Sequence, residues 1–374
     1  MAQPELIEFE HDPRLVDGYL RLLRRVHESD PNWIAPLEGA TRAALSPSNP
    51  FFRNSANRYR GFALKQGNEL VAHVLATVNH LHVASGERVG ALGFLEAEPD
   101  YRIFEQLITP ALHWLEREAF TTRVWATMNF DIWHGYRVMT RGFELPPFFG
   151  EPRNGPWLPE FLERAGFRSI KHWVSATTSR AFLVGRVGYF KQRYDQALVD
   201  GYRISPMMLK QTAQIADLHR AVSAAFDSFE GYTPITEDAF EALVGSFQRL
   251  TGTELATVLE DPAGHMAGFS IAFPDPSGIL RRLDGHDGWL HRWRLLFRPA
   301  SERALHYMIG VLPEARAAHR GLGSALMYDT LCRIISGNYP RTTFALMADD
   351  SPARYFAMDQ AEAAERAYTL YERT

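Results

Sequence analysis

Two spacings of apolar residues recur along the chain, one typical of β-strands and the other of α-helices. In the first half, alternating or short continuous apolar runs predict strands at Leu6–Phe9, Tyr59–Lys65, Glu69–Val78, Val89–Leu95, Arg123–Met128 and Ser169–Thr177. Apolar residues three and four positions apart predict helices at His11–Glu28, Tyr101–Glu118 and Pro156–Ala165. Prolines between the first helix and the second strand exclude long regular elements there. The first half therefore alternates between strands and helices.

The second half repeats this order of elements, although its residues are only weakly similar to those of the first half. Strands are predicted at Gly201–Ser205, Glu254–Glu260, Met266–Phe273, Ala304–Val311 and Thr342–Met347, and helices from Leu209 onward and at Leu322–Ser336. The segment Ala181–Val199 is the predicted connector and is helical around Tyr189–Leu198. This alternation predicts an α/β (α+β) fold in two tandem domains, 1–180 and 181–374, each with a mixed sheet.

Composition narrows the classes of function. A chain of 374 residues that is 46% hydrophobic can bury two cores, which excludes a disordered protein. The balance of 40 basic against 44 acidic residues provides no positive field, so we expect no nucleic-acid partner. The single cysteine, Cys332, excludes an internal disulfide and a cysteine-based zinc site, and we expect no metal. No signal peptide or membrane span is evident, so a cytoplasmic location is predicted, with peripheral contact at the inner membrane face as an addition.

One short motif points to chemistry. Arg320-Gly321-Leu322-Gly323-Ser324-Ala325 stands between a predicted strand and a predicted helix. Glycines at such a turn allow successive backbone N–H groups to point into one concavity, and the helix adds the positive end of its dipole. No lysine follows the glycines and the GxGxxG spacing is absent, which excludes a Walker loop and a dinucleotide fingerprint. The motif therefore predicts a cradle for a pyrophosphate group.

These residues resemble the acyl-CoA signature of the GCN5-related N-acetyltransferase (GNAT) superfamily, Arg/Gln-x-x-Gly-x-Gly/Ala. The preceding Val311-Leu312-Pro313-Glu314-Ala315-Arg316 is similar to the family's Val-x-Pro-x-x-Arg, so Arg316 and Arg320 both compete to begin the cradle. The resemblance implies a mostly antiparallel sheet flanked by helices in each domain, and acyl-CoA as co-substrate. The cofactor-binding residues that it implies are Val311, Leu312, Arg316, Arg320, Gly321, Leu322, Gly323, Ser324 and Ala325.

Longer segments are similar to a group of tandem-GNAT bacterial proteins that includes ceramide synthases. They are Asp30-Pro31-Asn32-Trp33, Ser48-Asn49-Pro50-Phe51-Phe52, Met128-Asn129-Phe130 and Gly231-Tyr232-Thr233-Pro234-Ile235-Thr236-Glu237. The resemblance implies direct transfer of an acyl group, fatty acyl in the specific version, from acyl-CoA to a small-molecule or lipid amine such as a sphingoid base. Two alternatives stay open: a transferase that uses an aminoacyl or carrier-protein donor, and a non-catalytic protein that binds CoA or a partner.

Candidates for the acid and the base are less sharply defined. The family's acid is a tyrosine in the pattern Asn-x-x-Ala-x-x-x-Tyr, but that position falls on Ala357 here, and Tyr355 lies two residues earlier. Glu230, with Asp227, lies on a loop expected to border the acceptor pocket, and His306 lies on the central strand. After a strand of the first half, Asp131 and His134 form a polar cluster that either lines a pocket or packs a turn.

Two further segments bear on the different roles predicted for the two halves. The first half has acidic Glu96-Ala97-Glu98-Pro99-Asp100 where a cradle would follow its strand, so it is predicted not to bind CoA and to shape the acceptor site or the structure. The segment Ile279–Arg303 mixes arginines with aromatic residues. It is either a helix that covers the sheet or an element that contacts an anionic membrane surface or an acyl chain.

Overall fold

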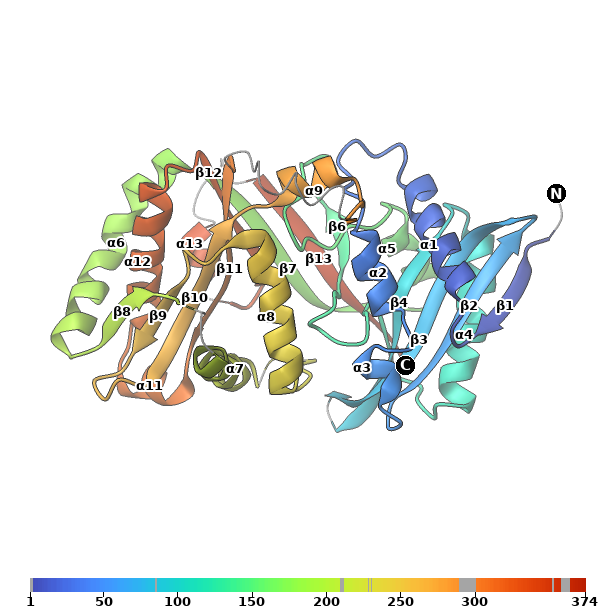
Figure 1. Ribbon diagram of the computed structural model, residues 1–374, viewed down its shortest axis with the longest axis horizontal. Coiled ribbons are helices and arrows are strands. Elements are labelled where there is room, and N and C mark those ends of the chain that lie inside the picture. Colours follow the sequence, from blue (N-terminus) through green and yellow to red (C-terminus); the bar gives the residue numbers. More distant parts are fainter. Residues whose placement is uncertain are drawn as a thin grey trace. The chain divides into compact units, whose positions relative to one another are not determined.

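The computed structural model describes residues 3–84, 86–208, 212–227, 229, 231–288, 301–351, 353–357 and 364–374, with backbone alone at 212, 213, 249, 355, 356 and 364. The chain forms two compact units (Figure 1). Unit 1 comprises Met1–Trp173, Ser277–Pro299 and Arg366–Thr374, and unit 2 comprises Val174–Pro276 and Ala300–Glu365. The units are therefore not the contiguous halves 1–180 and 181–374, because two later segments return to unit 1.

Unit 1 is an α/β layer structure built around an antiparallel sheet. Its elements are β1 (Glu5–Phe9), α1 (Pro13–Val26), α2 (Glu38–Ala44), α3 (Pro50–Arg53), β2 (Arg58–Gln66), β3 (Glu69–Ala84), β4 (Glu87–Ala97), α4 (Tyr101–Arg117), β5 (Val124–Ala126), β6 (Val138–Arg141), α5 (Leu158–Arg164) and the first half of β7 (Arg168–Ser179). Strands β1 to β4 pair antiparallel in chain order, and β4 pairs parallel with β5. The end of β13 (Ala364–Arg373) completes the unit by pairing antiparallel with β5 and β6.

The local sequence explains the helices of unit 1. Helix α4 buries an apolar stripe that includes Phe104, Leu107 and Ala111, which packs on the sheet at residues such as Val74. Asp100 caps this helix, because its side chain accepts a hydrogen bond from the backbone N–H of Arg102. Helix α1 packs against β3 and β4 in the same way with a second apolar stripe.

Unit 2 repeats the plan. Its elements are the end of β7, α6 (Arg180–Val199), β8 (Arg203–Pro206), α7 (Thr212–Phe226), α8 (Glu237–Thr251), β9 (Thr257–Glu260), β10 (Met266–Pro274), β11 (Arg303–Val311), α11 (Pro313–Ala318), α12 (Leu322–Ser336), β12 (Arg341–Ala348) and α13 (Arg354–Ala357). Strands β8 to β11 pair antiparallel, and β11 pairs parallel with β12. Helices α6 and α12 cover one face of this sheet, whereas α7 covers the other.

The predicted fold class is confirmed, but several elements were not predicted. The short helices α2 and α3 lie in the proline-rich loop, and β13 lies beyond Thr342–Met347, the last strand that the pattern indicated. Strand β13 hydrogen-bonds to β5 and β6, partners that are remote in sequence. Among the described residues, no helix is both long enough and apolar enough to span a bilayer.

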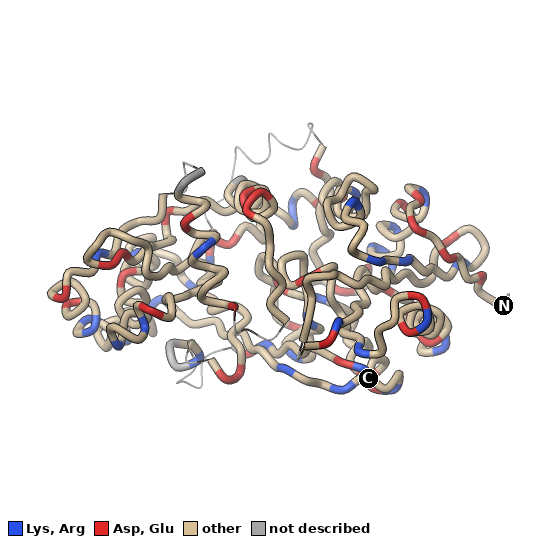
Figure 2. Tube along the Cα trace, turned by 90° about the horizontal axis from the view of Figure 1, so that it is seen from below, with Lys and Arg blue, Asp and Glu red and all other residues tan. Residues whose placement is uncertain are grey.

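The segment Ile279–Arg303 begins with a helix that packs in unit 1. In α9 (Ser277–Leu283), Ile279 and Leu283 are buried, and the Arg281 guanidinium donates a 2.8 Å hydrogen bond to the carbonyl of Pro31. An ion pair joins Arg24 to Asp284. The described part of the segment is thus a packing element, and residues 289–300 lie outside the described residues. Acidic and basic positions are interspersed along both units (Figure 2).

Candidate functional site

The parallel strands β11 and β12 of unit 2 separate partway along their length. Their register runs from Arg303 opposite Arg341 to His306 opposite Phe344, and both strands then continue for several residues without further pairing to each other. At Leu346, β12 adopts a φ of +51°, and its backbone N–H donates to Ser175 Oγ at 2.8 Å. Strand β10 pairs with one edge of β11, and β12 pairs with the other edge only as far as His306. The second edge of residues 307–311 therefore has no strand partner in the described chain. We call this opening the β11–β12 split.

The N-terminus of α12 lies directly after β11 and α11. Gly321 is its N-cap, with a φ of +94° and no side-chain cap. The first bond of the helix joins the Ala325 N–H to the Gly321 carbonyl at 3.0 Å, so the preceding N–H groups of α12 have no acceptor within the helix. A Cβ at position 321 would lie 2.7 Å from Arg193 Cδ, whereas at Gly323 it would meet only Val311 Cγ2 at 4.0 Å. The backbone here can adopt the predicted cradle.

Exposed arginine side chains lie near this helix end. Helix α11 accounts for the four-residue spacing between the two competing arginines: Arg316 lies in it and donates to the Val311 carbonyl at 2.9 Å, whereas Arg320 directly precedes Gly321. Arg320 and Arg193 are exposed, and neither forms an ion pair with a described residue. The nearby carboxylate of Asp200 lies 2.7 Å from His319 and forms no ion pair with either arginine. The local charge therefore favours an anion.

Arg193 was not among the predicted residues. It belongs to α6, far earlier in the chain than the glycine motif, and its side chain packs over Gly321. No sequence signal connects an arginine of the connector helix to the motif, because only the packing of α6 on α12 brings them together.

His306 lies at the last paired position before the β11–β12 split. It is buried, and its Nε2 atom is 3.1 Å from Ser270 Oγ, which also accepts a 2.9 Å hydrogen bond from Thr330 on α12. Burial lowers the pKa of His306 to about 4, so the ring is neutral at physiological pH. The Ser270 hydroxyl of β10 thus connects His306 of β11 with Thr330 of α12.

The other predicted catalytic residues have a limited structural description. The backbone of Tyr355 lies in α13, but its side chain and the whole of Glu230 lie outside the described residues. Asp227 is exposed just after α7. No group of three or more metal-ligating side chains comes together among the residues that the structure describes.

Asp131 and His134 form a pair within unit 1. His134 Nδ1 lies 2.7 Å from Asp131 Oδ1, which also accepts a 2.9 Å hydrogen bond from the Trp133 N–H. Burial acts to lower the pKa of His134, but the hydrogen bond and charge of Asp131 outweigh it and the pKa is raised. The pair thus organises the turn that follows β5 and leaves His134 partly exposed.

The corresponding region of unit 1 is filled by its own chain. Strands β4 and β5 pair from Gly90 opposite Val124 to Leu92 opposite Ala126. Beyond that point, the Met128 N–H donates to the Leu92 carbonyl at 3.0 Å, and the Phe94 N–H donates to Asn129 Oδ1 at 2.7 Å. Among the described residues of unit 1, no strand edge beside β5 stays open in the same way.

The acidic segment of unit 1 is also used internally. Glu96 lies 2.9 Å from His27, Glu98 forms a 3.0 Å ion pair with Arg25, and Asp100 caps α4. The N-terminus of α4 thus carries a carboxylate where α12 carries a glycine.

The remaining motifs of the first half pack within unit 1. Trp33 stacks on His27 with ring centroids 5.3 Å apart, and Phe51 packs on Phe130 at 4.6 Å. Asn32 donates to the Glu144 carbonyl at 3.0 Å. These residues stabilise the loops that close one side of the sheet.

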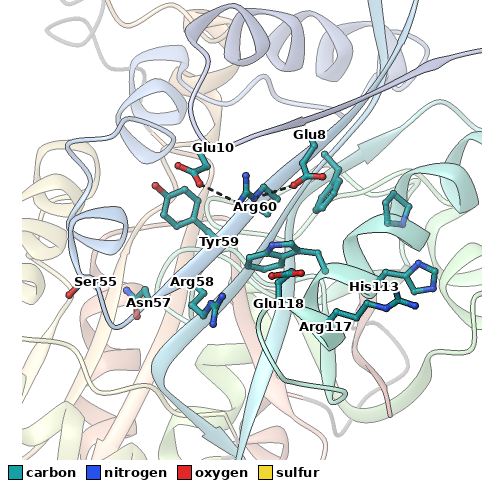
Figure 3. A pocket seen from close by; sticks show the side chains of 13 residues that line it. Glu8, Glu10, Ser55, Asn57, Arg58, Tyr59, Arg60, His113, Arg117 and Glu118 are labelled. Carbon is teal, nitrogen blue, oxygen red and sulfur yellow. Dashed lines mark ion pairs between the residues drawn. The ribbon is translucent and has the colours of Figure 1, made fainter.

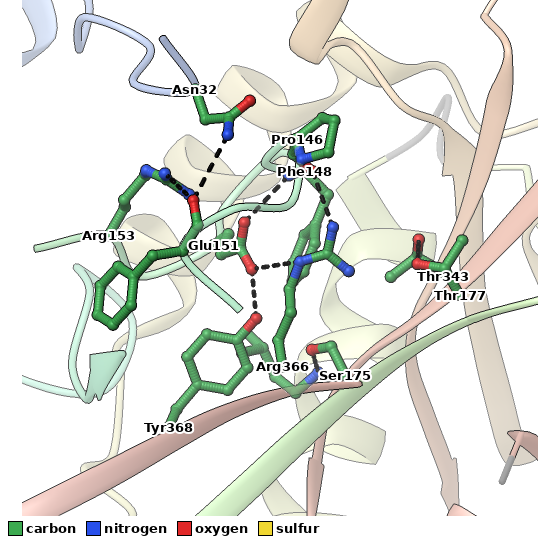
Figure 4. Close-up of polar contacts among 12 residues, drawn as sticks. Asn32, Pro146, Phe148, Glu151, Arg153, Ser175, Thr177, Thr343, Arg366 and Tyr368 are labelled. Carbon is green, nitrogen blue, oxygen red and sulfur yellow. Dashed lines mark hydrogen bonds and ion pairs between the residues drawn. The ribbon is translucent and has the colours of Figure 1, made fainter. Parts of the chain in front are cut away.

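A buried ionic cluster accompanies them, and no sequence signal predicted it (Figure 4). Arg366 of β13 lies 3.1 Å from the Glu151 carboxylate, and both side chains are almost inaccessible. The Tyr368 hydroxyl donates to the same carboxylate. Burial raises the pKa of Glu151 despite the opposing charge of Arg366. The cluster forms only because β13 returns to unit 1.

Unit 1 also has an open pocket of about 640 Å³ between β2 and α4 (Figure 3). Arg60 on its wall pairs with Glu8 at 3.5 Å and with Glu10 at 3.4 Å. None of its lining residues comes from β4 or β5, so this pocket is separate from the region that corresponds to the β11–β12 split.

Comparisons with known proteins fit this geometry. No protein-family model matches the chain. The bacterial ceramide synthase of Caulobacter vibrioides (strain NA1000 / CB15N) is 23% identical over 317 residues, covering 83% of this chain and 81% of that protein. A tandem GNAT protein from the clavulanic acid biosynthesis pathway aligns with a TM-score of 0.55 and 15% identity over 99% of this chain and 98% of its own.

A GCN5-related N-acetyltransferase from Sphaerobacter thermophilus aligns with a TM-score of 0.52 and 12% identity, covering 100% of this chain and 96% of its own. The predicted mixed, mostly antiparallel sheets flanked by helices agree with these folds. The resemblance that the sequence indicated is thus confirmed: the chain has the tandem GNAT fold and is similar to acyltransferases along most of its length.

Proposed function

We propose that this protein is an N-acyltransferase that uses acyl-CoA at unit 2. The observation that carries the proposal is the β11–β12 split beside the uncapped N-terminus of α12. A CoA thioester has an anionic diphosphate at one end and a linear arm with two amides at the other. The first suits a helix end with Arg320 and Arg193 nearby, and the second suits an unpaired strand edge.

The proposed reaction is direct transfer. The lone pair of a neutral amine attacks the thioester carbonyl carbon, the C–S bond breaks, the amine nitrogen loses a proton, and the sulfur leaves as a thiolate that takes up a proton. Backbone N–H groups of residues 308–311 can stabilise the developing oxyanion, because these residues pair with β10 along the other edge of β11. In this proposal Gly321, Leu322, Gly323 and Ser324 bind the diphosphate.

The proton-transfer residues remain predictions. Tyr355 and Glu230 are retained as candidates for direct contact with the reacting groups. His306 is a positioning residue in this proposal, since its buried hydrogen bond to Ser270 holds β11 where the split begins.

For the substrates, we propose a fatty acyl donor and a lipid amine such as a sphingoid base. The similarity to a protein named bacterial ceramide synthase supports this choice. Unit 1, in which the chain fills the corresponding strand edge, is proposed to serve the acceptor or the structure rather than a second CoA.

Product detection tests the proposal. The full chain is incubated with acyl-CoA donors from two to eighteen carbons and with sphinganine, amino acids or an acidic carrier protein, and thiol release and product mass are measured. We expect amide formation with a long-chain donor and an amino lipid. Gly323→Val should weaken acyl-CoA binding without unfolding the protein, because a Cβ at position 323 makes only an ordinary contact with Val311 Cγ2 at 4.0 Å.

Asp100→Asn in unit 1 is the matched control and should bind acyl-CoA normally, since asparagine also caps helices. Absence of CoA binding by the unaltered chain would overturn the proposal. Turnover with a carrier-protein thioester alone would favour the alternative donor.

A further inference from the structure

The face of β10 and β11 opposite α12 carries a layer of aromatic side chains. Phe247 of α8 meets Phe273 of β10 edge-on, with ring centroids 4.6 Å apart, and lies 6.3 Å from Tyr307 of β11. Phe273 and Tyr307 lie 5.7 Å apart. We call these three rings the aromatic layer. It belongs wholly to unit 2.

Neighbouring side chains settle which face this is. A Cβ at Gly268 would face Leu326 of α12 at 3.2 Å, whereas the next residue, Phe269, lies 6.5 Å from Phe226 of α7. Ser270 accepts a hydrogen bond from Thr330 of α12. Ala272 belongs to the buried cluster of Met327 on the same helix, so the alternation persists past the register shift at Ile271. Phe273 therefore lies on the same side as Phe269. The aromatic layer therefore lies on the α7 and α8 side of the sheet.

Helix α8 covers this side incompletely. Phe273 is buried, but Phe247 and Tyr307 are only half-buried, as are Ile271 and Met308 of the strands beneath. The apolar residues that follow the helical spacing on α8, Leu243, Val244 and Leu250, are half-buried as well. The accessible parts of these side chains are apolar and lie on one side of the sheet, which suits an apolar ligand.

The position of Tyr307 connects this surface to the proposed donor site. Tyr307 directly follows His306, the last residue of β11 that pairs with β12. It is therefore both a member of the aromatic layer and the first residue of the strand edge along which the pantetheine arm is proposed to bind. An acyl group joined to the end of that arm begins where the aromatic layer begins.

We propose that the aromatic layer binds the acyl chain of the donor, and that Phe247 limits the length of chain accepted. The inference rests on the proposed function, which it makes more specific. A saturated chain needs no polar partner, and each methylene transferred from water to an apolar surface contributes roughly a fourfold gain in affinity. Chain-length preference is thus set by how many methylenes the rings of unit 2 can cover.

The motif Gly231-Tyr232-Thr233-Pro234 fixes the position of the helices beside the aromatic layer. It forms the connection between α7 and α8, where Gly231 has a φ of +81° and Thr233 is almost completely buried. His219 of α7 lies 2.8 Å from the Ile235 carbonyl, which fixes the loop on the helix. The loop therefore sets the spacing of α7 and α8 beside the aromatic layer.

Binding measurements across donor lengths test the inference. The dissociation constants of free CoA and of acyl-CoA from two to eighteen carbons are measured by calorimetry for the unaltered chain and for Phe247→Ala, Phe247→Leu and Phe247→Trp. In the unaltered chain, affinity should rise about fourfold per methylene up to a limiting length. Phe247→Trp should shorten that limit, and Phe247→Ala and Phe247→Leu should lengthen it or flatten the profile. Free CoA should bind all variants equally.

Phe182→Ala provides the matched control, because Phe182 is a half-buried ring on α6, on the opposite side of the same unit. It should leave the chain-length profile unchanged. Identical profiles in all Phe247 variants, with free CoA still bound, would overturn the inference alone. A change in amine chain length instead of acyl chain length would assign the layer to the acceptor and also overturn it. No binding of free CoA by the unaltered chain would instead contradict the proposed function.

Discussion

Units 1 and 2 contain the same arrangement of a strand, a helix and a parallel strand. They differ in what contacts the edge of the first strand beyond the last pair of the two. In unit 1, Asn129 supplies the acceptor for the Phe94 N–H beyond the last β4–β5 pair. In unit 2, the edge of β11 beyond His306 pairs with no strand in the described part of the chain. One fold thus offers a closed and an open version of the same site, and the difference depends on a few residues after each strand.

The helix that follows each strand shows the same contrast. Asp100 caps α4 and adds a negative charge, whereas Gly321 leaves α12 uncapped beside Arg320 and Arg193, which form no ion pair with a described residue. A helix N-terminus attracts anions when its N–H groups have no acceptor and no carboxylate lies beside them. In unit 1, Asp100 supplies both the acceptor and the negative charge. In unit 2, no described side chain caps α12.

Reversal of the charge in unit 2 should produce the largest effect. Arg320→Glu is expected to weaken acyl-CoA binding about 10- to 100-fold, since it replaces a charge-assisted contact with repulsion. Titration calorimetry at two salt concentrations measures the loss and its screening. Glu98→Gln in unit 1 is the control and should bind normally. Equal weakening by the two variants would remove the contrast between the units.

Removal of the internal acceptor in unit 1 should affect stability alone. Asn129→Ala leaves the Phe94 N–H without its partner, which should lower the free energy of unfolding by about 1–3 kcal/mol. Asn129→Asp retains an acceptor oxygen and should lose less. Urea denaturation measures both, and acyl-CoA affinity should stay constant. A gain or loss of binding in Asn129→Ala would show that unit 1 takes part in donor binding.

Buried histidines should make both units sensitive to acid. Burial lowers the pKa of His73 in unit 1 and of His306 in unit 2 to about 4 each. Since the unfolded chain protonates near the ordinary value of about 6.5, it binds more protons than the folded chain between these pH values. The free energy of unfolding is therefore highest above about pH 6.5. It decreases as the pH falls toward 4, by at most about 1.4 kcal/mol per pH unit for each histidine.

Thermal melting between pH 4.5 and 7.5 measures this dependence. His306→Gln and His73→Gln should each flatten the slope, whatever their effect on stability at pH 7.5. Exposed His113 provides the control, because it lies in neither core, and His113→Gln should keep the slope. An unchanged slope in both buried variants would contradict the expected linkage.

The smallest effect concerns the cap of α4. Asp100→Ala should cost about 1 kcal/mol of stability, because the Arg102 N–H loses its acceptor, and Asp100→Ser should cost only tenths of that. Differential scanning calorimetry resolves the difference. Loss of activity per folded molecule in Asp100→Ala would show that α4 has a role beyond structure.

Much of this arrangement could be predicted from the sequence because the signals are local. The glycine motif lies within six consecutive residues, and the spacing of apolar residues indicated α4, α12, β4 and β11. The acidic segment that begins at Glu96 indicated a difference in charge between the two helix ends, and the structure shows these acids in contacts within unit 1. The split itself was not predictable, because it is a relation between two strands, and beyond it the Leu346 N–H donates to Ser175 of a third strand.

The sequence by itself determined the alternation of strands and helices, the repetition of the plan and the position of the glycine motif before α12, since each follows from neighbours within a few residues. Only the tertiary structure decided which segments belong to each unit: β13 and α9 return to unit 1 because their partners, such as Glu151 for Arg366 and Pro31 for Arg281, lie far away in sequence. It also brought Arg193 to Gly321 and Phe247 to Tyr307. Such pairs result from the packing of whole helices on a sheet, which no local pattern encodes.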